Sequence, residues 1–282
     1  MEKNKVAVIG AGLMGNGIAQ ACDTFEAAIE KSKATVEKLF SRKVTKGSMT
    51  EEKKAEILGR LTYSQNFEDV KGAFLVVEAV PEKIEIKKDT FKKVDELADA
   101  ETIIVSNTSG LSISEIASVT NRQDKVMGAH FFYPAPVMKL LELVRGLVTS
   151  DETYDVVKEF AGKIGKTTVD APEFPGFMVN RILVPMQNEA AFMVMEGSKP
   201  EDVDNAMKLG CNHPMGPIEL TDFVGIDTML ATMTGLYNGF HDSKYRPCPL
   251  LETMVKSGML GKKTGQGFYK YDEKGNKIGS NF

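Results

Sequence analysis

The first half of the chain alternates short apolar, β-branched runs with longer segments in which apolar residues recur at helical spacing. We expect strands over residues 6–9, 74–79, 103–106, 126–130 and 140–144, and a last short strand over 167–169. Residues 84–97 have the spacing of an amphipathic helix, and Ser112 with Glu115 forms a Ser-x-x-Glu capping box. This alternation predicts a parallel sheet covered by helices, in the α/β class.

The pattern changes after Ala171-Pro-Glu-Phe-Pro175, where two prolines interrupt regular structure and mark a domain boundary. Residues 177–195 are nearly continuously apolar, and residues 201–209 and 222–236 follow with helical spacing and few strand signals. We therefore expect one domain over residues 1–171 and an all-helical second domain over residues 176–282.

The apolar stretch 177–195 reaches the length of a membrane helix. Polar residues interrupt it, at Asn180, Arg181, Gln187, Asn188 and Glu189. Their burial in lipid would cost too much, so a helix in a core or in a homodimer interface fits better. We expect a homodimer and no membrane partner.

Composition narrows the possible partners, metal sites and cellular location of the protein. The net charge of -4 argues against a nucleic-acid partner. The cysteines at 22, 211 and 248 are odd in number and widely separated, which fits neither a zinc site nor a disulfide framework. With no secretory signal at the N-terminus, these features predict a cytoplasmic protein without a metal site.

The first strand runs into Gly10-Ala-Gly12-Leu13-Met14-Gly15, a G-x-G-x-x-G turn. Gly10 allows the tight turn, Gly12 lets the backbone approach a pyrophosphate, and Gly15 lets helix and strand pack closely. A following helix would direct its N-terminus at the phosphates. The turn predicts a Rossmann-type, doubly wound domain that binds a dinucleotide.

The second strand of such a domain is missing from the pattern. An acidic residue about 20 positions beyond the glycines normally ends that strand and binds the adenosine ribose. Here the chain passes from Cys22 into a helical run over 27–40, and Asp23 is the ribose candidate although it comes early. Either about ten residues are absent or the adenosine pocket is rearranged. If Asp23 reaches the ribose, it favours NAD over NADP. The choice between the two cofactors stays open.

Of the three histidines, His130 has the strongest context. It ends a predicted strand, where a sheet of this kind opens onto its ligand crevice. Neutral imidazole suits the removal of a hydroxyl proton during hydride transfer. Glu142 lies in an apolar run where a charged side chain needs a partner, so it is the candidate carboxylate that orients His130. The alternative for Glu142 is an exposed strand position.

Several motifs, in one order, resemble 3-hydroxyacyl-CoA dehydrogenases over nearly the whole chain. They are Gly10-Ala-Gly-Leu-Met-Gly-Asn-Gly-Ile-Ala-Gln20, Ser106-Asn-Thr-Ser109, His130-Phe-Phe, Pro136-Val-Met-Lys-Leu140, Pro175-Gly-Phe-Met-Val-Asn-Arg181 and Gly261-Lys-Lys-Thr-Gly-Gln-Gly-Phe-Tyr269. The resemblance is to the free-standing bacterial form that acts on 3-hydroxybutyryl-CoA, in fatty acid and butanoate metabolism. It implies an NAD cofactor, an acyl-CoA substrate, His130 as the catalytic base and Glu142 as its orienting carboxylate.

The same resemblance implies the other site residues. Ser109 and Asn180 would hold the substrate's 3-oxygen, although capping or buried structural bonds would also explain them. Residues on the cofactor side would be Gly10, Gly12, Leu13, Met14, Gly15, Asp23, Glu82, Lys87, Asn107, Ser109 and Tyr133. Tyr133 departs from the family, which has Asn at that position. The lysine-rich helix over 30–46 matches the region that contacts CoA in relatives.

Two other functions remain open from the sequence. One is a dehydrogenase of free 3-hydroxy acids, which has a similar architecture. The other is a nucleotide-binding protein that has lost catalysis, suggested by the missing second strand and by Tyr133. Comparing activity on a CoA thioester with activity on the free acid tests the first alternative. The affinity for NADH tests the second.

Overall fold

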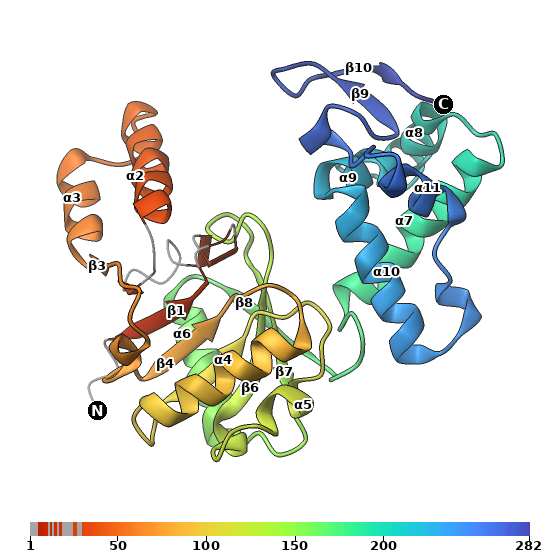
Figure 1. The fold of residues 1–282 in the computed structure, drawn as a ribbon. Helices are drawn as coiled ribbons and strands as arrows, with labels where there is room; N and C mark the ends of the chain where they lie inside the picture. The colour runs from red at the N-terminus through yellow and green to blue at the C-terminus, as the bar shows by residue number, and fades with distance from the viewer. Residues whose placement is uncertain (1–4, 11, 13, 16, 19–24, 27–29) are drawn as a thin grey trace. The chain divides into compact units, whose positions relative to one another are not determined.

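The computed structural model describes the chain apart from residues 1–4, 11, 13, 16, 19–24 and 27–29. The chain divides into two compact units, Met1–Glu173 and Phe174–Phe282 (Figure 1). The first contains a mostly parallel sheet with helices, and the second is mainly helical. The fold class predicted from the hydrophobic pattern is confirmed.

The largest sheet among the described residues has six strands, in the order β1-β4-β5-β6-β7-β8. Their bounds are β1 Val6–Ile9, β4 Leu75–Glu78, β5 Ile103–Ser106, β6 Val126–Phe131, β7 Leu140–Arg145 and β8 Thr167–Ala171. Neighbours pair in parallel except β6 and β7, which are antiparallel. The expectation of a parallel sheet was wrong for this one pair. The connecting residues 132–139 are fewer than the dozen or more that a parallel crossover needs.

The helices of this unit are α2 Glu30–Thr45, α3 Glu51–Gly59, α4 Ile84–Leu97, α5 Ile113–Ala117 and α6 Asp151–Lys163, with 3₁₀ turns η1 Phe67–Val70 and η2 Gln123–Lys125. The predicted bounds of α4 are confirmed. Ser112 caps α5 as predicted, because its hydroxyl accepts a 3.1 Å bond from the backbone N–H of Glu115. The carboxylate of Glu115 lies 3.4 Å from Nζ of Lys88.

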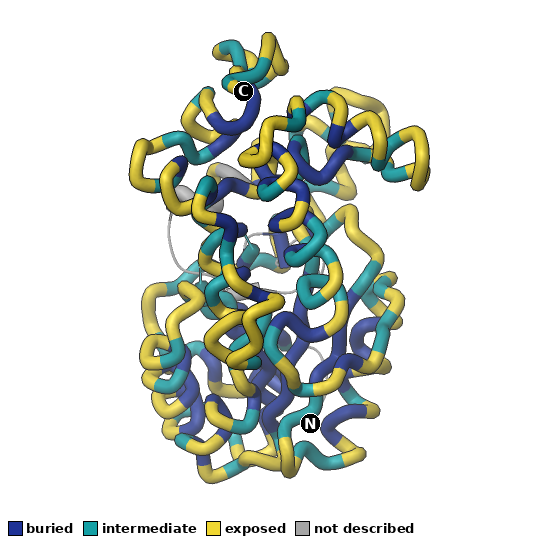
Figure 2. The backbone as a smooth tube through the Cα atoms, turned by 90° about the vertical axis from the view of Figure 1, so that its right-hand side faces the viewer, coloured by how far each residue is buried: buried dark blue, intermediate teal, exposed yellow. Residues whose placement is uncertain are grey.

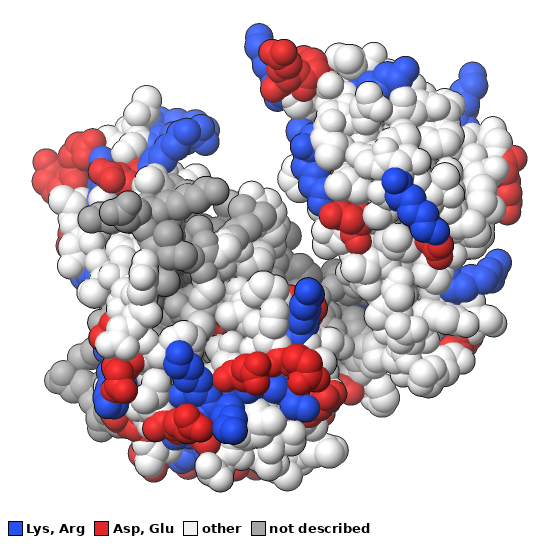
Figure 3. Space-filling view, viewed as in Figure 1, with Lys and Arg blue, Asp and Glu red and all other residues white. Residues whose placement is uncertain are grey.

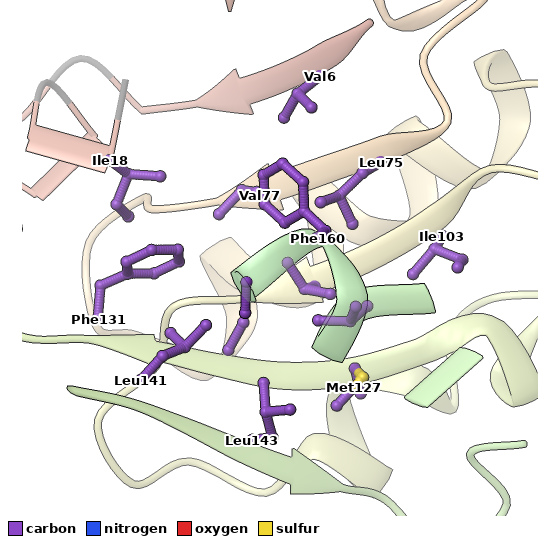
Figure 4. Close-up of a cluster of buried hydrophobic side chains, with 14 of the residues drawn as sticks. Val6, Ile18, Leu75, Val77, Ile103, Met127, Phe131, Leu141, Leu143 and Phe160 are labelled. Atoms are coloured by element: carbon purple, nitrogen blue, oxygen red, sulfur yellow. The ribbon is translucent and has the colours of Figure 1, made fainter. Parts of the chain in front are cut away.

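The core of the first unit lies between its strands and helices. All residues of β4, β5 and β6 are buried, as expected for strands covered on both faces. Val77, Phe131, Leu141 and Phe160 are among the side chains that pack together there (Figure 4). Figure 2 shows the buried stretches of the backbone in dark blue. These strands hold their carboxyl ends, where the candidate residues lie, in fixed register.

A short second strand follows the glycine turn. β2, Phe25–Glu26, pairs in parallel with β3, Leu61–Thr62, in a two-stranded sheet separate from the six-stranded one. This pair does not supply the second strand of the doubly wound sheet, because among the described residues β1 pairs with β4 alone and lies at the edge of the six-stranded sheet. Two residues carry too little β-branched pattern to be recognised.

The second unit contains α7 Val179–Met195, α8 Pro200–Gly210, α9 Pro217–Val224, α10 Ile226–Phe240 and α11 Pro249–Lys256, with 3₁₀ turns η3 Ser243–Tyr245 and η4 Lys262–Thr264 and strands β9 Tyr269–Tyr271 and β10 Lys277–Ser280. Among the described residues, every helix falls short of the length and hydropathy that a bilayer span requires.

Two details of the second unit differ from the prediction. The run 222–236 is broken at Gly225, whose φ of 105° lies outside the helical region and separates α9 from α10. The unit is also not all-helical, because β9 and β10 form an antiparallel hairpin. The buried carboxylate of Asp222 in α9 fastens this hairpin, since it accepts bonds from the backbone N–H groups of Phe268 and Tyr269 at 2.9 and 2.8 Å.

Candidate active site

The antiparallel pairing of β6 with β7 sets His130 directly opposite Glu142. Nδ1 of His130 lies 2.6 Å from Oε2 of Glu142. Both residues are buried, and the ring of Phe132 lies against the imidazole with 4.5 Å between the ring centroids. A carboxylate at Nδ1 favours the tautomer with hydrogen on Nδ1, so Nε2 is the basic nitrogen of the neutral ring. The pair can therefore accept a proton at Nε2.

The loop after β5 is tied to the strand that carries His130. β5 and β6 are parallel neighbours, so the loop begins at the edge of the sheet where β6 ends. Oδ1 of Asn107 accepts a 2.9 Å bond from the backbone N–H of Phe131, the residue after His130. The backbone N–H of Asn107 donates to the carbonyl of Glu78 at the end of β4. The loop is thus held from both sides.

Glu82 binds the far end of that loop. Its Oε1 accepts hydrogen bonds from the Thr108 hydroxyl at 2.6 Å, the Ser109 backbone N–H at 2.8 Å and the Ser109 hydroxyl at 3.1 Å. Its other oxygen, Oε2, lies 3.2 Å from Nζ of Lys87. The structure therefore brings the candidates Glu82, Lys87 and Ser109 into one hydrogen-bonded cluster.

Glu78, the last residue of β4, also belongs to this cluster and was not among the residues predicted from the sequence. Oε1 of Glu78 lies 2.7 Å from Nζ of Lys87, and each of the two side chains is only 1% exposed. A signal was present, because Glu78 is an ionisable residue at the end of the apolar run Phe74-Leu-Val-Val77. The same reasoning had singled out Glu142.

The glycine turn has the close contacts expected of a dinucleotide site. A Cβ on Gly10 would lie 2.4 Å from the carbonyl oxygen of Ala79, and one on Gly15 would lie 1.7 Å from that of Gly10. A Cβ on Gly12 would meet none of the described atoms within 4 Å. The first and third glycines are thus required by packing. The second leaves space beside the backbone, where a pyrophosphate fits.

The remaining candidates occupy different surroundings. Met14 packs against the core of the first unit, while Leu13 and Asp23 lie outside the described residues. Tyr133 is 48% exposed and lies two residues beyond the end of β6, which carries His130. Asn180 is the second residue of α7 and belongs to the second unit.

Comparison with known proteins decides the family. Residues 5–174 match the NAD-binding domain of 3-hydroxyacyl-CoA dehydrogenases, and residues 176–271 match their C-terminal domain. The chain belongs to the 3-hydroxyacyl-CoA dehydrogenase family. The predicted family and enzyme class are confirmed, and the NAD-binding domain supports NAD(H) as the cofactor.

Relatives within the 3-hydroxyacyl-CoA dehydrogenase family cover nearly the whole chain. A probable 3-hydroxybutyryl-CoA dehydrogenase of Bacillus subtilis is 48% identical over 97% of this chain and 99% of its own. The 3-hydroxybutyryl-CoA dehydrogenase of Clostridioides difficile is 48% identical over 95% of this chain and 100% of its own. The crystal structure of the (S)-3-hydroxybutyryl-CoA dehydrogenase of Ralstonia eutropha superposes with a TM-score of 0.92 at 44% identity. The match covers 96% of this chain and 100% of the Ralstonia chain.

The alignments also bear on the missing segment. The aligned stretch of the Bacillus protein is 285 residues long, whereas 97% of this 282-residue chain is about 274 residues. About 11 aligned positions of that dehydrogenase therefore have no counterpart here. This number is similar to the roughly ten residues by which the chain falls short of the expected Rossmann pattern.

Proposed function

We propose that this protein interconverts 3-hydroxybutyryl-CoA and acetoacetyl-CoA with NAD(H). The observation that carries the proposal is the buried pair of His130 and Glu142, with 2.6 Å between Nδ1 and Oε2, at the sheet edge where the Ser109 loop also begins. The names of the relatives from Bacillus, Clostridioides and Ralstonia support a four-carbon acyl group.

His130 acts as the general base in this reaction. Nε2 accepts the proton of the 3-hydroxyl group during oxidation and returns it during reduction. Glu142 holds the tautomer and stabilises the imidazolium once it forms. Asn180 donates a hydrogen bond to the 3-oxygen, whose negative charge grows as the proton leaves. The Ser109 hydroxyl, which donates its one hydrogen to Glu82 in the structure, turns to donate to the same oxygen, while the backbone N–H of Ser109 keeps its bond to Glu82.

The residues of the first unit fit an NAD(H) cofactor. The open space beside Gly12 and the close packing at Gly10 and Gly15 suit a pyrophosphate at the turn. Glu82, Lys87, Asn107 and Tyr133 would contact the nicotinamide half. When bound, the nicotinamide accepts or supplies the hydride at C3 of the substrate. We propose NADH rather than NADPH, with Asp23 at the ribose.

The CoA moiety would contact the basic helix α2. Lys38, Arg42 and Lys43 lie on it, and basic side chains gather over α2 while acidic ones gather over α3 (Figure 3). Ammonium and guanidinium groups suit the phosphates of CoA. We also propose a cytoplasmic location, since Cys211 is an exposed free thiol.

Oxidation of NADH by the purified protein, followed by absorbance, tests the function. Acetoacetyl-CoA should support rapid turnover, and free acetoacetate should support little or none. Equal rates with the two compounds would favour a dehydrogenase of free acids. Absence of turnover with either compound would favour the protein that has lost catalysis, and weak NADH binding in calorimetry would favour it as well.

A further inference from the structure

A buried ion pair stands at the carboxyl end of β4. Nζ of Lys87 and Oε1 of Glu78 are 2.7 Å apart, and both side chains are 1% exposed. Removing two charges from water is costly, and two apolar side chains of similar size would often stabilise the fold as well or better. This position therefore calls for a reason other than stability.

Glu78 is fixed by donors from three separate segments. Its carboxylate accepts 2.7 Å bonds from the backbone N–H of Val80 and from Nζ of Lys87, and a 2.6 Å bond from the hydroxyl of Ser106. The first donor belongs to the turn after β4, the second to the first turn of α4 and the third to the end of β5. Glu78 thus joins three elements of the sheet edge.

Two routes of hydrogen bonds lead from this carboxylate to the Ser109 loop. In the first, Lys87 also lies 3.2 Å from Oε2 of Glu82, whose Oε1 holds the backbone and hydroxyl of Ser109. In the second, the Ser106 hydroxyl, which donates to Glu78, accepts a 3.2 Å bond from the backbone N–H of Thr108.

Charge alternates along the first route. The negative Glu78 faces the positive Lys87, which faces the negative Glu82. The side chain of Glu82 is 41% exposed, so water alone would leave it several rotamers. The buried Glu78 holds Lys87 in place, and Lys87 in turn restrains Glu82.

We propose that Glu78 is a positioning residue, which fixes Lys87, Glu82 and the Ser109 loop in the arrangement that the reaction needs. The inference rests on the proposed function, because Ser109 is the donor to the substrate oxygen there. Glu78 itself touches neither substrate nor cofactor. A displacement of about 1 Å at such a site costs up to about 100-fold in rate.

The experiment compares Glu78→Gln with a matched control, Asp95→Asn. Asp95 is also buried and paired, with its Oδ1 2.6 Å from Nε of Arg122. It lies in the same helix α4 but eight residues beyond Lys87, about 12 Å along the helix axis. Each change swaps a buried carboxylate for an isosteric amide, so both should lower the unfolding midpoint in urea.

Kinetics and NADH binding then distinguish a residue that positions the site from one that only stabilises the fold. We expect Glu78→Gln to lower kcat with acetoacetyl-CoA about 10-fold to 100-fold and to weaken NADH binding in calorimetry, with a small change in the KM of acetoacetyl-CoA. Asp95→Asn should leave all three at wild-type values. If Glu78→Gln does not fold, Glu78→Asp keeps the charge but shortens the reach, and it should lower kcat about tenfold.

Several results would overturn the inference. Wild-type kinetics and NADH affinity in a folded Glu78→Gln or Glu78→Asp protein would do so, as would equal kinetic losses in Asp95→Asn. A wild-type protein that binds NADH but does not reduce acetoacetyl-CoA would instead contradict the proposed function. In that case the NADH affinities of the Glu78 variants still decide whether Glu78 positions the cluster.

Discussion

His130 has the environment that a general base requires. It is buried beside a buried carboxylate, so its orientation and its tautomer are both fixed before substrate arrives. We predict that His130→Gln lowers kcat roughly 100-fold to 10,000-fold, the usual cost of losing a general base. The amide of glutamine can still donate to Glu142, so this carboxylate keeps a hydrogen bond. NADH affinity, measured by calorimetry, should change little.

The matched control for this variant is His241→Gln. His241 is exposed and ends α10 with a φ of 53°. The His241→Gln protein should keep wild-type turnover. Turnover within a few-fold of wild type in His130→Gln would exclude His130 as the base.

Asp222 gives the second unit a pH-dependent stability. Burial raises the pKa of this carboxyl from 3.8 to about 6, against the opposing bonds from Tyr269, Phe268 and Tyr271. The folded state therefore holds the proton more tightly than the unfolded state between these two values, and the stability contributed by this group falls as pH rises. The fall is complete above about pH 6 and amounts to about 3 kcal/mol at most.

Asp222→Asn tests this linkage. At pH 4 the folded wild type has a protonated carboxyl here, both of whose oxygens can accept hydrogen bonds, whereas the amide nitrogen of asparagine cannot accept one. The variant should therefore be less stable than wild type at pH 4. The difference in free energy of unfolding should shrink as pH rises to about 7, because only the wild type has the Asp222 carboxyl to ionise, while the other groups titrate in both proteins. Urea unfolding followed by tyrosine fluorescence measures both proteins. A difference that is constant with pH, or that grows, would contradict the assigned direction.

At the scale of elements, the glycine turn separates a packing role from a binding role. Gly15→Ala would place a methyl group 1.7 Å from the carbonyl oxygen of Gly10, so we expect a loss of about 2 kcal/mol or more in stability. Gly12→Ala meets no described atom within 4 Å and should keep the wild-type unfolding midpoint. If the pyrophosphate lies there, Gly12→Ala should still weaken NADH binding at least tenfold. Unchanged NADH affinity in Gly12→Ala would remove the turn as the phosphate site.

The same elements show what the sequence can predict. The bounds of β1 and α4 follow from local periodicity, and the cap at Ser112 follows from two residues three apart. The antiparallel direction of β7 is not local, although the short segment 132–139 contained the signal. The break at Gly225 was hidden because the apolar spacing continues across it.

The candidate site was predictable to a similar extent. The pairing of His130 with Glu142 could be expected from two unusual polar residues in apolar runs, supported by the family resemblance. For Glu78 the same signal pointed to a buried charge but not to its partners, because Ser106 lies 28 residues away along the chain. Only the register of β4 with β5 brings these two side chains together.

At the scale of the whole molecule, each unit has its own buried core. One core packs around the six-stranded sheet, and the other is formed by α7 and the helices and hairpin that follow it. The proposed donors Ser109 and Asn180 belong to different units.

The exposed side of α7 supports a homodimer. Met178, Ile182 and Met193 are 40%, 76% and 44% exposed. Ile182 lies one turn beyond Met178 and three turns before Met193, so the three share one face of the helix, which also carries the exposed Glu189. Apolar side chains gathered on one face mark an interaction site. We propose that this face packs against a second copy of the chain.

We predict that Ile182→Glu yields a monomer. A charge buried in an apolar interface costs several kcal/mol, enough to raise the dissociation constant by more than about 100-fold. Light scattering at micromolar concentration should give twice the 30.9 kDa of one chain for the wild type and about 30.9 kDa for the variant. Leu147→Glu is the control, because Leu147 is 88% exposed but lies in the first unit, and this variant should remain dimeric. A monomeric wild type, or a dimeric Ile182→Glu, would exclude this face as the interface.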